Sequence, residues 1–310
     1  ILLFSIPLLI GNIFQQLYNI ADLVIVGRTL GVEPFAAVGA VAPVFFLIMF
    51  VIVGLTNGFA VITGQKYGAK DISGVRRSVV ISIILSILVT FLFSILCTIF
   101  MNSILHWMNV PENIYHNAYW YVEIIVIGLI STTMYNMLAS IIRALGDSKT
   151  PLYFLIIASI ANIFLALLFI KVFNWGVPGS AVAVILSQGI SVILCLFFIK
   201  YKFPILHITK NDWNFDNKYD FWNSAYEHLR VGVPMAIQFS IIGIGIIIIQ
   251  SVCNTFGSNV IAALTAALRI EQIATLPMMS FGVALAAYVA QNFGAKKFKR
   301  IRLGVIKTST

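Results

Sequence analysis

Charged side chains are scarce in this sequence, and acidic ones are the scarcest. Asp, Glu, Lys and Arg make up only 10% of the 310 residues, whereas 60% of the residues are hydrophobic and the mean hydropathy is +0.98. A soluble globule of this length needs far more polar side chains to cover its surface. The composition therefore excludes a soluble protein and indicates a protein that lies in a lipid bilayer.

Side chains that build covalent or metal sites are also few. The three cysteines, Cys97, Cys195 and Cys253, are scattered through apolar segments, and the four histidines lie near the ends of such segments or between them. Neither set has the spacing of a disulfide framework or a zinc site. We therefore expect no metal and no enzyme, since an intramembrane enzyme needs a paired acidic or histidine site at one membrane face.

Long apolar runs are what the sequence does contain. Each run is long enough to cross about 30 Å of hydrocarbon as a helix. The runs therefore predict an all-α polytopic membrane protein. The eight predicted spans lie at residues 2–26, 35–63, 77–101, 117–142, 151–173, 177–199, 230–253 and 261–290.

The basic residues are distributed unevenly between the loops. Of the 20 Lys and Arg residues, 17 lie between spans 2 and 3, 4 and 5, or 6 and 7, or follow span 8, whereas the opposite loops hold only Arg28 and Lys171. Short cytoplasmic loops are enriched in Lys and Arg. The pattern therefore predicts a multi-pass protein of the cytoplasmic membrane with its N-terminus in the cytoplasm. Because topology explains the net charge of +9, we expect no nucleic-acid partner.

An internal repeat links the two ends of the chain. Residues 36–76 and 262–302 match in order at a displacement of 226, and Pro7 recurs as Pro234 at 227. Six spans separate the two copies, so both cross the membrane in the same direction and are related by an axis along the membrane normal. The matching pairs include Ala36 and Ala262, Gln65 and Gln291, Gly68 and Gly294, and Arg76 and Arg302.

The repeat predicts two lobes of six helices each. Residues 1–200 form the N-lobe, residues 201–229 form a polar cytoplasmic linker, and residues 230–310 contain the first two helices of the C-lobe. Two repeats of about 226 residues each would make a protein of about 452 residues. We therefore expect a truncated chain that lacks its true N-terminus and most of the C-lobe.

One carboxylate lies inside the first apolar run. Asp22 follows Asn12, Gln15 and Asn19 at spacings of three, four and three residues, so the four side chains share one helical face. A charged group at the centre of a membrane helix costs about 2.5–3.5 kcal/mol and usually marks an ion or substrate path. This polar face predicts a transporter.

Two segments and one repeated motif carry a family resemblance. The first segment reads QQLYN at 15–19 and DLVIVGR at 22–28, the second reads RALGDSKTP at 143–151, and GAK occurs at 68–70 and again at 294–296. Together they resemble the multidrug and toxic compound extrusion (MATE) transporters of the MOP superfamily. The resemblance extends through the whole chain.

The resemblance implies an antiporter that exports amphipathic, often cationic, drugs or toxic small molecules in exchange for protons or sodium ions. It implies that Asp22 binds the coupling cation together with Asn162 and Asn19, and that the first helix bends at Pro7. A proline inside a helix removes a backbone hydrogen bond and favours a kink. No cofactor other than the coupling ion is implied, and the bilayer and a small molecule are the expected partners of a monomer.

The sequence departs from the family pattern at two positions. The pattern has an Asp four residues after Asn162 and a hydroxyl in the sixth span, where this chain has Ala166 and Val184. A sodium ion needs several oxygen ligands, whereas a proton needs one carboxylate. The two departures favour protons, although both coupling ions stay open.

Polar and aromatic side chains are candidates for the substrate cavity, because drug pockets are mainly apolar with a few polar groups. In the eighth span, Glu271 and Arg269 are candidates for a cation site of the C-lobe. The predicted cavity residues are Asn12, Gln15, Tyr18, Tyr135 and Gln238.

Two other functions stay open. A lipid-linked oligosaccharide flippase of the same superfamily is expected to present several arginines to its cavity, and Arg269 is the only intramembrane candidate. A membrane scaffold without transport leaves the polar face that ends at Asp22 unexplained. Cation-coupled export is therefore the leading prediction.

Overall fold

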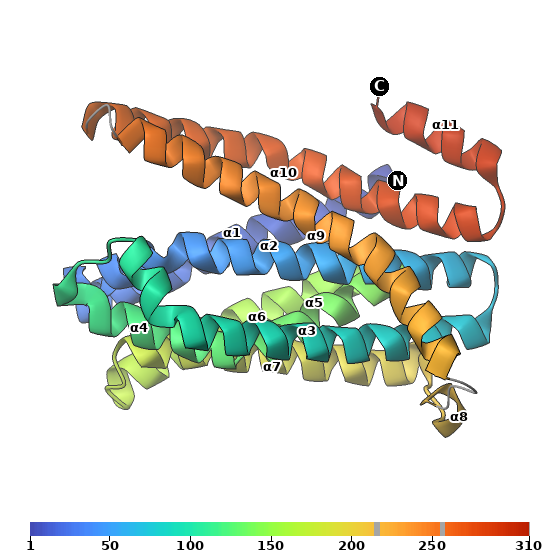
Figure 1. The fold of residues 1–310 in the computed structure, drawn as a ribbon, viewed down its shortest axis with the longest axis horizontal. Helices are drawn as coiled ribbons and strands as arrows, with labels where there is room; N and C mark the ends of the chain where they lie inside the picture. Colours follow the sequence, from blue (N-terminus) through green and yellow to red (C-terminus); the bar gives the residue numbers. More distant parts are fainter. Residues whose placement is uncertain (214–217, 255–257, 310) are drawn as a thin grey trace.

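A computed structural model describes residues 1–213, 218–254 and 258–309, and within these ranges the chain forms helices joined by short turns (Figure 1). The first seven α-helices are α1 (Leu2–Leu30), α2 (Val32–Gly68), α3 (Ile72–Trp107), α4 (Glu112–Ile127), α5 (Leu129–Ala144), α6 (Lys149–Leu167) and α7 (Val177–Lys202). They are followed by α8 (Lys210–Trp213), α9 (Lys218–Asn254), α10 (Ser258–Gly294) and α11 (Phe298–Ser309). Two short elements, η1 (Leu168–Val172) and η2 (Pro204–Leu206), follow α6 and α7.

The described helices account for the predicted spans. Seven helices are long and apolar enough to cross a membrane, and the number rises to eight if the bent pair α4 and α5 is one span. The fourth predicted span is thus broken by a bend of 48° next to Gly128. A side chain at Gly128 would overlap Ile185 of α7, so glycine allows α7 to pack against the bend.

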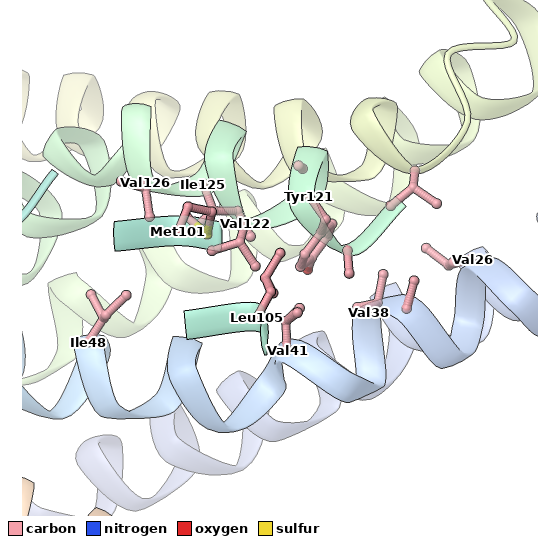
Figure 2. Close-up of a cluster of buried hydrophobic side chains, with 14 of the residues drawn as sticks. Val26, Val38, Val41, Ile48, Met101, Leu105, Tyr121, Val122, Ile125 and Val126 are labelled. Atoms are coloured by element: carbon pink, nitrogen blue, oxygen red, sulfur yellow. The ribbon is translucent and has the colours of Figure 1, made fainter. Parts of the chain in front are cut away.

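The N-lobe is held together by close-packed apolar side chains. In Figure 2, Val41 of α2 faces Leu105 of α3 and Val122 of α4, and all three belong to one buried cluster. Lipid tails are as apolar as these side chains, so moving the side chains from lipid into the core gains little hydrophobic free energy. Van der Waals packing therefore supplies much of the free energy that holds the helices together. The same cluster includes Tyr121 and Val26, and it therefore fixes α4 beside the C-terminal half of α1.

The turn between α2 and α3 is closed by an N-cap. Asp71 accepts hydrogen bonds from the Gly74 amide at 2.8 Å and the Ser73 hydroxyl at 2.9 Å. The hydrogen bond from Gly74 lowers the pKa of Asp71, and the charges of Lys66 and Arg77 act in the same direction. Asp71 thus stabilises the start of α3 in its ionised form.

Replacing Asp71 with Ala is expected to destabilise the protein by about 1 kcal/mol at pH 7, the usual cost of a lost N-cap. Because the folded-state pKa lies below the unfolded value of about 3.9, this stabilisation is present above that pH and is lost as the pH falls through the lowered pKa. Thermal unfolding of both proteins between pH 7 and pH 3 should show the difference shrink in acid. Asp71→Asn keeps a capping oxygen and is the matched control; a difference that does not change with pH would contradict this assignment.

The two ends of the repeat meet in space. A side chain at Gly68 would overlap the backbone of Gln291, and a side chain at Gly294 would overlap the backbone of Gln65. Each contact is the other one displaced by 226 residues, as a two-fold axis between the lobes requires. Helices of the two lobes therefore touch through backbone at this end of the molecule, where small residues permit close approach. In Figure 1 the lobes converge here and diverge toward the C-terminal end of α9.

Candidate functional site

Asp22 lies buried where α1, α4 and α7 meet. Its Oδ1 accepts a hydrogen bond from the Ser180 hydroxyl at 2.7 Å, and its Oδ2 accepts one from the Tyr121 hydroxyl at 3.4 Å. Only 5% of Asp22 is exposed. Among the described residues its partners are neutral hydroxyls, and no Lys or Arg forms an ion pair with it. A carboxylate in this position is held without a compensating positive charge.

A second group of polar side chains lies one turn away from Asp22. Tyr18 and Asn162 are both buried, and within the described part of the chain neither polar atom of the Asn162 amide has a hydrogen-bond partner. Gln188 of α7 adds a buried amide oxygen that also has no hydrogen-bond partner among the described residues. Buried polar atoms without partners are rare and call for an explanation such as a bound ion or water.

The packing of α6 places Asn162 near Asp22. Gly11 of α1 lies against Leu152 and Leu155 of α6, and Ile25 packs against the cluster that contains Ala166. Because contacts advance along both helices in the same direction at about 1.5 Å per residue, Asn162 lies at about the level of residues 18 to 21 of α1. The structure thus brings Asn162 to the height of Tyr18, about one turn from Asp22.

Two residues of this site were missed by the sequence analysis. Tyr121 had no assigned role, and the expectation that the sixth span supplies no hydroxyl was wrong, because Ser180 supplies it one turn before Val184. Position 166 does lack an oxygen ligand, as the sequence indicated, and Ala166 is buried. Counting along antiparallel helices from Asp22 would have pointed to the start of α7, but helix direction alone does not fix which face meets Asp22.

The other predicted residues are dispersed. Asn19 and Gln15 are partly exposed on α1, and the Asn12 amide donates to the Ser280 hydroxyl of α10 at 3.0 Å. Tyr135 lies in the N-lobe core, where its hydroxyl donates to the Pro151 carbonyl at 3.1 Å, rather than on an open surface. Pro7 is buried inside a continuous α1, whereas Gln238 and Glu271 are exposed; the side chain of Arg269 lies outside the described residues.

Replacing Asn162 with Leu is expected to stabilise the protein. Leu is similar in size and removes two buried polar atoms without partners, each of which costs about 1–3 kcal/mol. We expect the melting temperature to rise. A lower melting temperature would contradict the assignment, because it would mean that the amide is satisfied in the resting protein.

The comparisons with known proteins identify the family. The MatE family profile matches residues 7–168 and 234–308, which is more than half of the chain. The chain belongs to the MatE family. The probable multidrug resistance protein YpnP of Bacillus subtilis (strain 168) is 33% identical over 305 residues, which cover 97% of this chain and 66% of that protein. YoeA of the same strain, also a probable multidrug resistance protein, is 30% identical and covered over 65% of its length.

Solved structures agree with this family. An outward-facing conformation of a multidrug resistance MATE family transporter of the MOP superfamily matches with a TM-score of 0.88 and 26% identity. The match covers 98% of this MatE chain and 67% of that chain. The all-helical membrane fold is thereby confirmed, and the family is one of transporters rather than enzymes. This MatE chain spans just under two thirds of the length of the two Bacillus subtilis relatives.

Proposed function

We propose that the protein exports amphipathic, often cationic, small molecules in exchange for a cation that binds at Asp22. One observation carries the proposal: Asp22 is buried between three helices, and its hydrogen-bond partners among the described residues are two hydroxyls. An uncompensated carboxylate in a membrane protein marks an ion path, since a bound cation or proton supplies the missing positive charge. The multidrug resistance relatives support the choice of substrate.

Protons are the coupling ion that the site favours. Both oxygens of Asp22 are engaged by hydroxyl donors, and position 166, where the family pattern has a carboxylate, is Ala166. Sodium needs several oxygens arranged around it. Its ligands here would be Asp22, Asn162 and the hydroxyl oxygens of Ser180 and Tyr121, whose hydrogens would first have to turn away from the ion. A proton needs one carboxylate oxygen and a change in hydration, because loss of water favours the neutral form of a carboxyl.

The coupling site belongs to the N-lobe. The repeat-equivalent of Asp22 is Ile249 on α9, which is 51% exposed, so the C-lobe has no carboxylate at this position. Glu271 is exposed and stands apart from the N-lobe cluster. Movement of α1 about Pro7 would carry Asp22, Asn19 and Gln15 together, since all lie beyond the proline on one helix.

The proposed cycle links ion and drug at α1. We place the N-terminus in the cytoplasm, so that the lobes touch at the cytoplasmic end and part toward the outside. Binding of a proton to Asp22 from the outside removes the charge that holds a cationic drug, and the drug leaves. By thermodynamic linkage, binding of the drug then weakens proton binding by the same factor by which the proton weakens drug binding.

Transport in liposomes tests the proposal. The whole protein, reconstituted with a proton gradient or a sodium gradient imposed separately, should move ethidium against its concentration gradient. Export driven by the proton gradient alone is the expected result. Export that needs sodium would replace the proton by sodium at the same site, and no export under either gradient would reject the proposed function.

A further inference from the structure

The turn between α6 and α7 carries three aromatic rings close to the Asp22 site. At the end of α6 the helix widens in η1, where the Phe173 amide donates to the Leu168 carbonyl, five residues back, at 3.1 Å. Wide helical turns of this kind occur often at functional sites. The chain then reverses, and the Trp175 amide donates to the Phe169 carbonyl at 3.0 Å. The turn thus folds Trp175 back onto Phe169.

The rings of Phe169, Phe173 and Trp175 form an aromatic stack. The centroids of Phe169 and Trp175 are 4.9 Å apart, and their planes differ by 13°. The Phe173 ring lies 5.9 Å from that of Phe169 and 5.6 Å from that of Trp175. Stacked rings at these separations attract each other beyond the effect of the area that they bury. The aromatic stack therefore stiffens the turn between α6 and α7.

The first turn of α7 rests directly on the aromatic stack. A Cβ atom at Gly179 would lie 3.1 Å from the Cβ atoms of both Phe169 and Trp175, so the backbone of α7 reaches the stack without an intervening side chain. The next residue is Ser180, whose hydroxyl donates to Asp22 at 2.7 Å. The stack therefore fixes the position of the helical turn that presents this hydroxyl.

The surroundings of the stack also reach α1 beside Asp22. Phe169 belongs to a buried cluster with Ala183 of α7, and Ile25 of α1 packs against that cluster. Ile25 lies three residues after Asp22, less than one helical turn away. Phe169 thus belongs to a cluster that joins α1 and α7, the two helices that the hydrogen bond from Ser180 connects.

The hydrogen bond from Ser180 is sensitive to this packing. Hydrogen bonds weaken steeply as their geometry departs from the ideal distance and angle. Ser180 is fully buried and Asp22 is 5% exposed, so water has little access to replace the hydroxyl. A small displacement of the first turn of α7 would therefore weaken one of the two hydroxyl donors of Asp22.

We propose that the aromatic stack positions Ser180 against Asp22 and thereby sets how tightly the carboxyl group holds its proton. This inference rests on the proposed function. A hydrogen bond to a carboxylate favours the charged form, so a weaker bond from Ser180 lets Asp22 hold the proton more tightly. Trp175 acts through Ser180 and is a positioning residue. Aromatic rings also anchor proteins at membrane surfaces, but an anchor alone would leave the proton affinity of Asp22 unchanged.

Other titratable groups stand near Asp22 and stay constant in the test. Tyr18 lies one turn earlier on α1, and Tyr121 reaches Asp22 from α4. The titratable residues of α2, α6 and α7 lie toward the ends of those helices. Glu33 of α2 and Lys171 of η1 are exposed. Since substitutions in the turn leave all of these groups in place, a changed pH response reports the hydroxyl donor on α7.

The pH dependence of drug binding measures the proton affinity of Asp22. Ethidium binding to the whole protein in detergent should weaken in acid, because drug and proton compete for the carboxylate. Loss of a hydrogen bond to a charged group changes an equilibrium constant by about tenfold, so Ser180→Ala should move the midpoint upward by about one pH unit. Trp175→Leu and Gly179→Ala, which disturb the support from either side, should each move it upward by about half a unit.

The double variant Trp175→Leu with Ser180→Ala tests whether the ring acts through the hydroxyl. We expect its midpoint to equal that of Ser180→Ala alone, because a support has no effect once the supported donor is gone. Trp107→Leu is the matched control, since Trp107 is 89% exposed at the end of α3 and would serve only as an anchor. Its midpoint should equal that of the unmodified protein.

Three results would overturn the positioning role: an unchanged midpoint in both Trp175→Leu and Gly179→Ala, an equal shift in Trp107→Leu, or shifts that add in the double variant. Melting temperatures are measured alongside, and a lower melting temperature without a shifted midpoint also counts against the role. In each case the unmodified protein still binds ethidium more weakly in acid. Ethidium binding by the unmodified protein that does not depend on pH would instead reject proton coupling in the proposed function.

Discussion

Asp22→Asn in the whole protein is expected to reduce gradient-driven export by about 5- to 150-fold, the range that corresponds to a coupling free energy of about 1–3 kcal/mol. The amide keeps the shape of the carboxylate, and its one oxygen can accept the hydrogen bond from Ser180, whereas the NH2 group that replaces the other oxygen can only donate, to the Tyr121 hydroxyl. It cannot gain or lose a proton, and it attracts a cation weakly. Because a buried charge is removed rather than created, the fold should persist.

The control for Asp22→Asn is Ser180→Ala, which keeps the carboxylate and removes one donor. This variant should change the rate of export but retain its dependence on the ion gradient. Ethidium export under an imposed gradient, with melting temperatures measured alongside, distinguishes the two. Undiminished gradient-driven export by Asp22→Asn would remove Asp22 from the coupling mechanism.

Gly68→Ala is expected to have the largest effect on stability. The added methyl group would overlap the backbone of Gln291, so the backbone must shift to admit it. Overpacking of this kind costs about 1–3 kcal/mol, and more where the neighbour is backbone. We expect a lower melting temperature and a molecule that no longer closes at the α2–α3 end.

Gly39→Ala is the matched control for Gly68→Ala, because Gly39 lies on the same helix and, among the described residues, no atom outside its own stretch of helix lies within 4 Å of the place that its added methyl group would take. That substitution should be neutral or should stabilise the helix by up to about 1 kcal/mol. Thermal unfolding of the whole protein in detergent compares the two variants. Equal melting temperatures would mean that the lobes do not touch at Gly68 in the resting protein.

Much of the fold was predictable because its signals are local. The apolar runs fix the spans, and the pairs Gln65 with Gln291 and Gly68 with Gly294 predict two lobes related by an axis. The structure adds that these two pairs contact each other at that axis. The bend next to Gly128 was not predicted, because the fourth apolar run is continuous and the packing of Gly128 against Ile185 joins helices that are distant in the sequence.

The site was predictable only in part. Asp22 was predicted from the free-energy cost of a charged side chain in a membrane helix and from the helical face that it shares with other polar residues. Both are properties of a single helix. Ser180 and Tyr121 act on it from α7 and α4, and their role depends on how three helices are rotated against one another. Tyr135 was placed in the cavity because its ring suits drugs, but its hydroxyl is engaged by Pro151 inside the N-lobe.

Proton release on drug binding tests the central claim most directly. Calorimetric titration of the whole protein with a cationic drug, in two buffers with different heats of ionisation, counts the protons released at constant pH. We expect the unmodified protein to release protons and Asp22→Asn to release none, while both bind the drug. Equal proton release by the two proteins would contradict the assignment of the coupling site to Asp22.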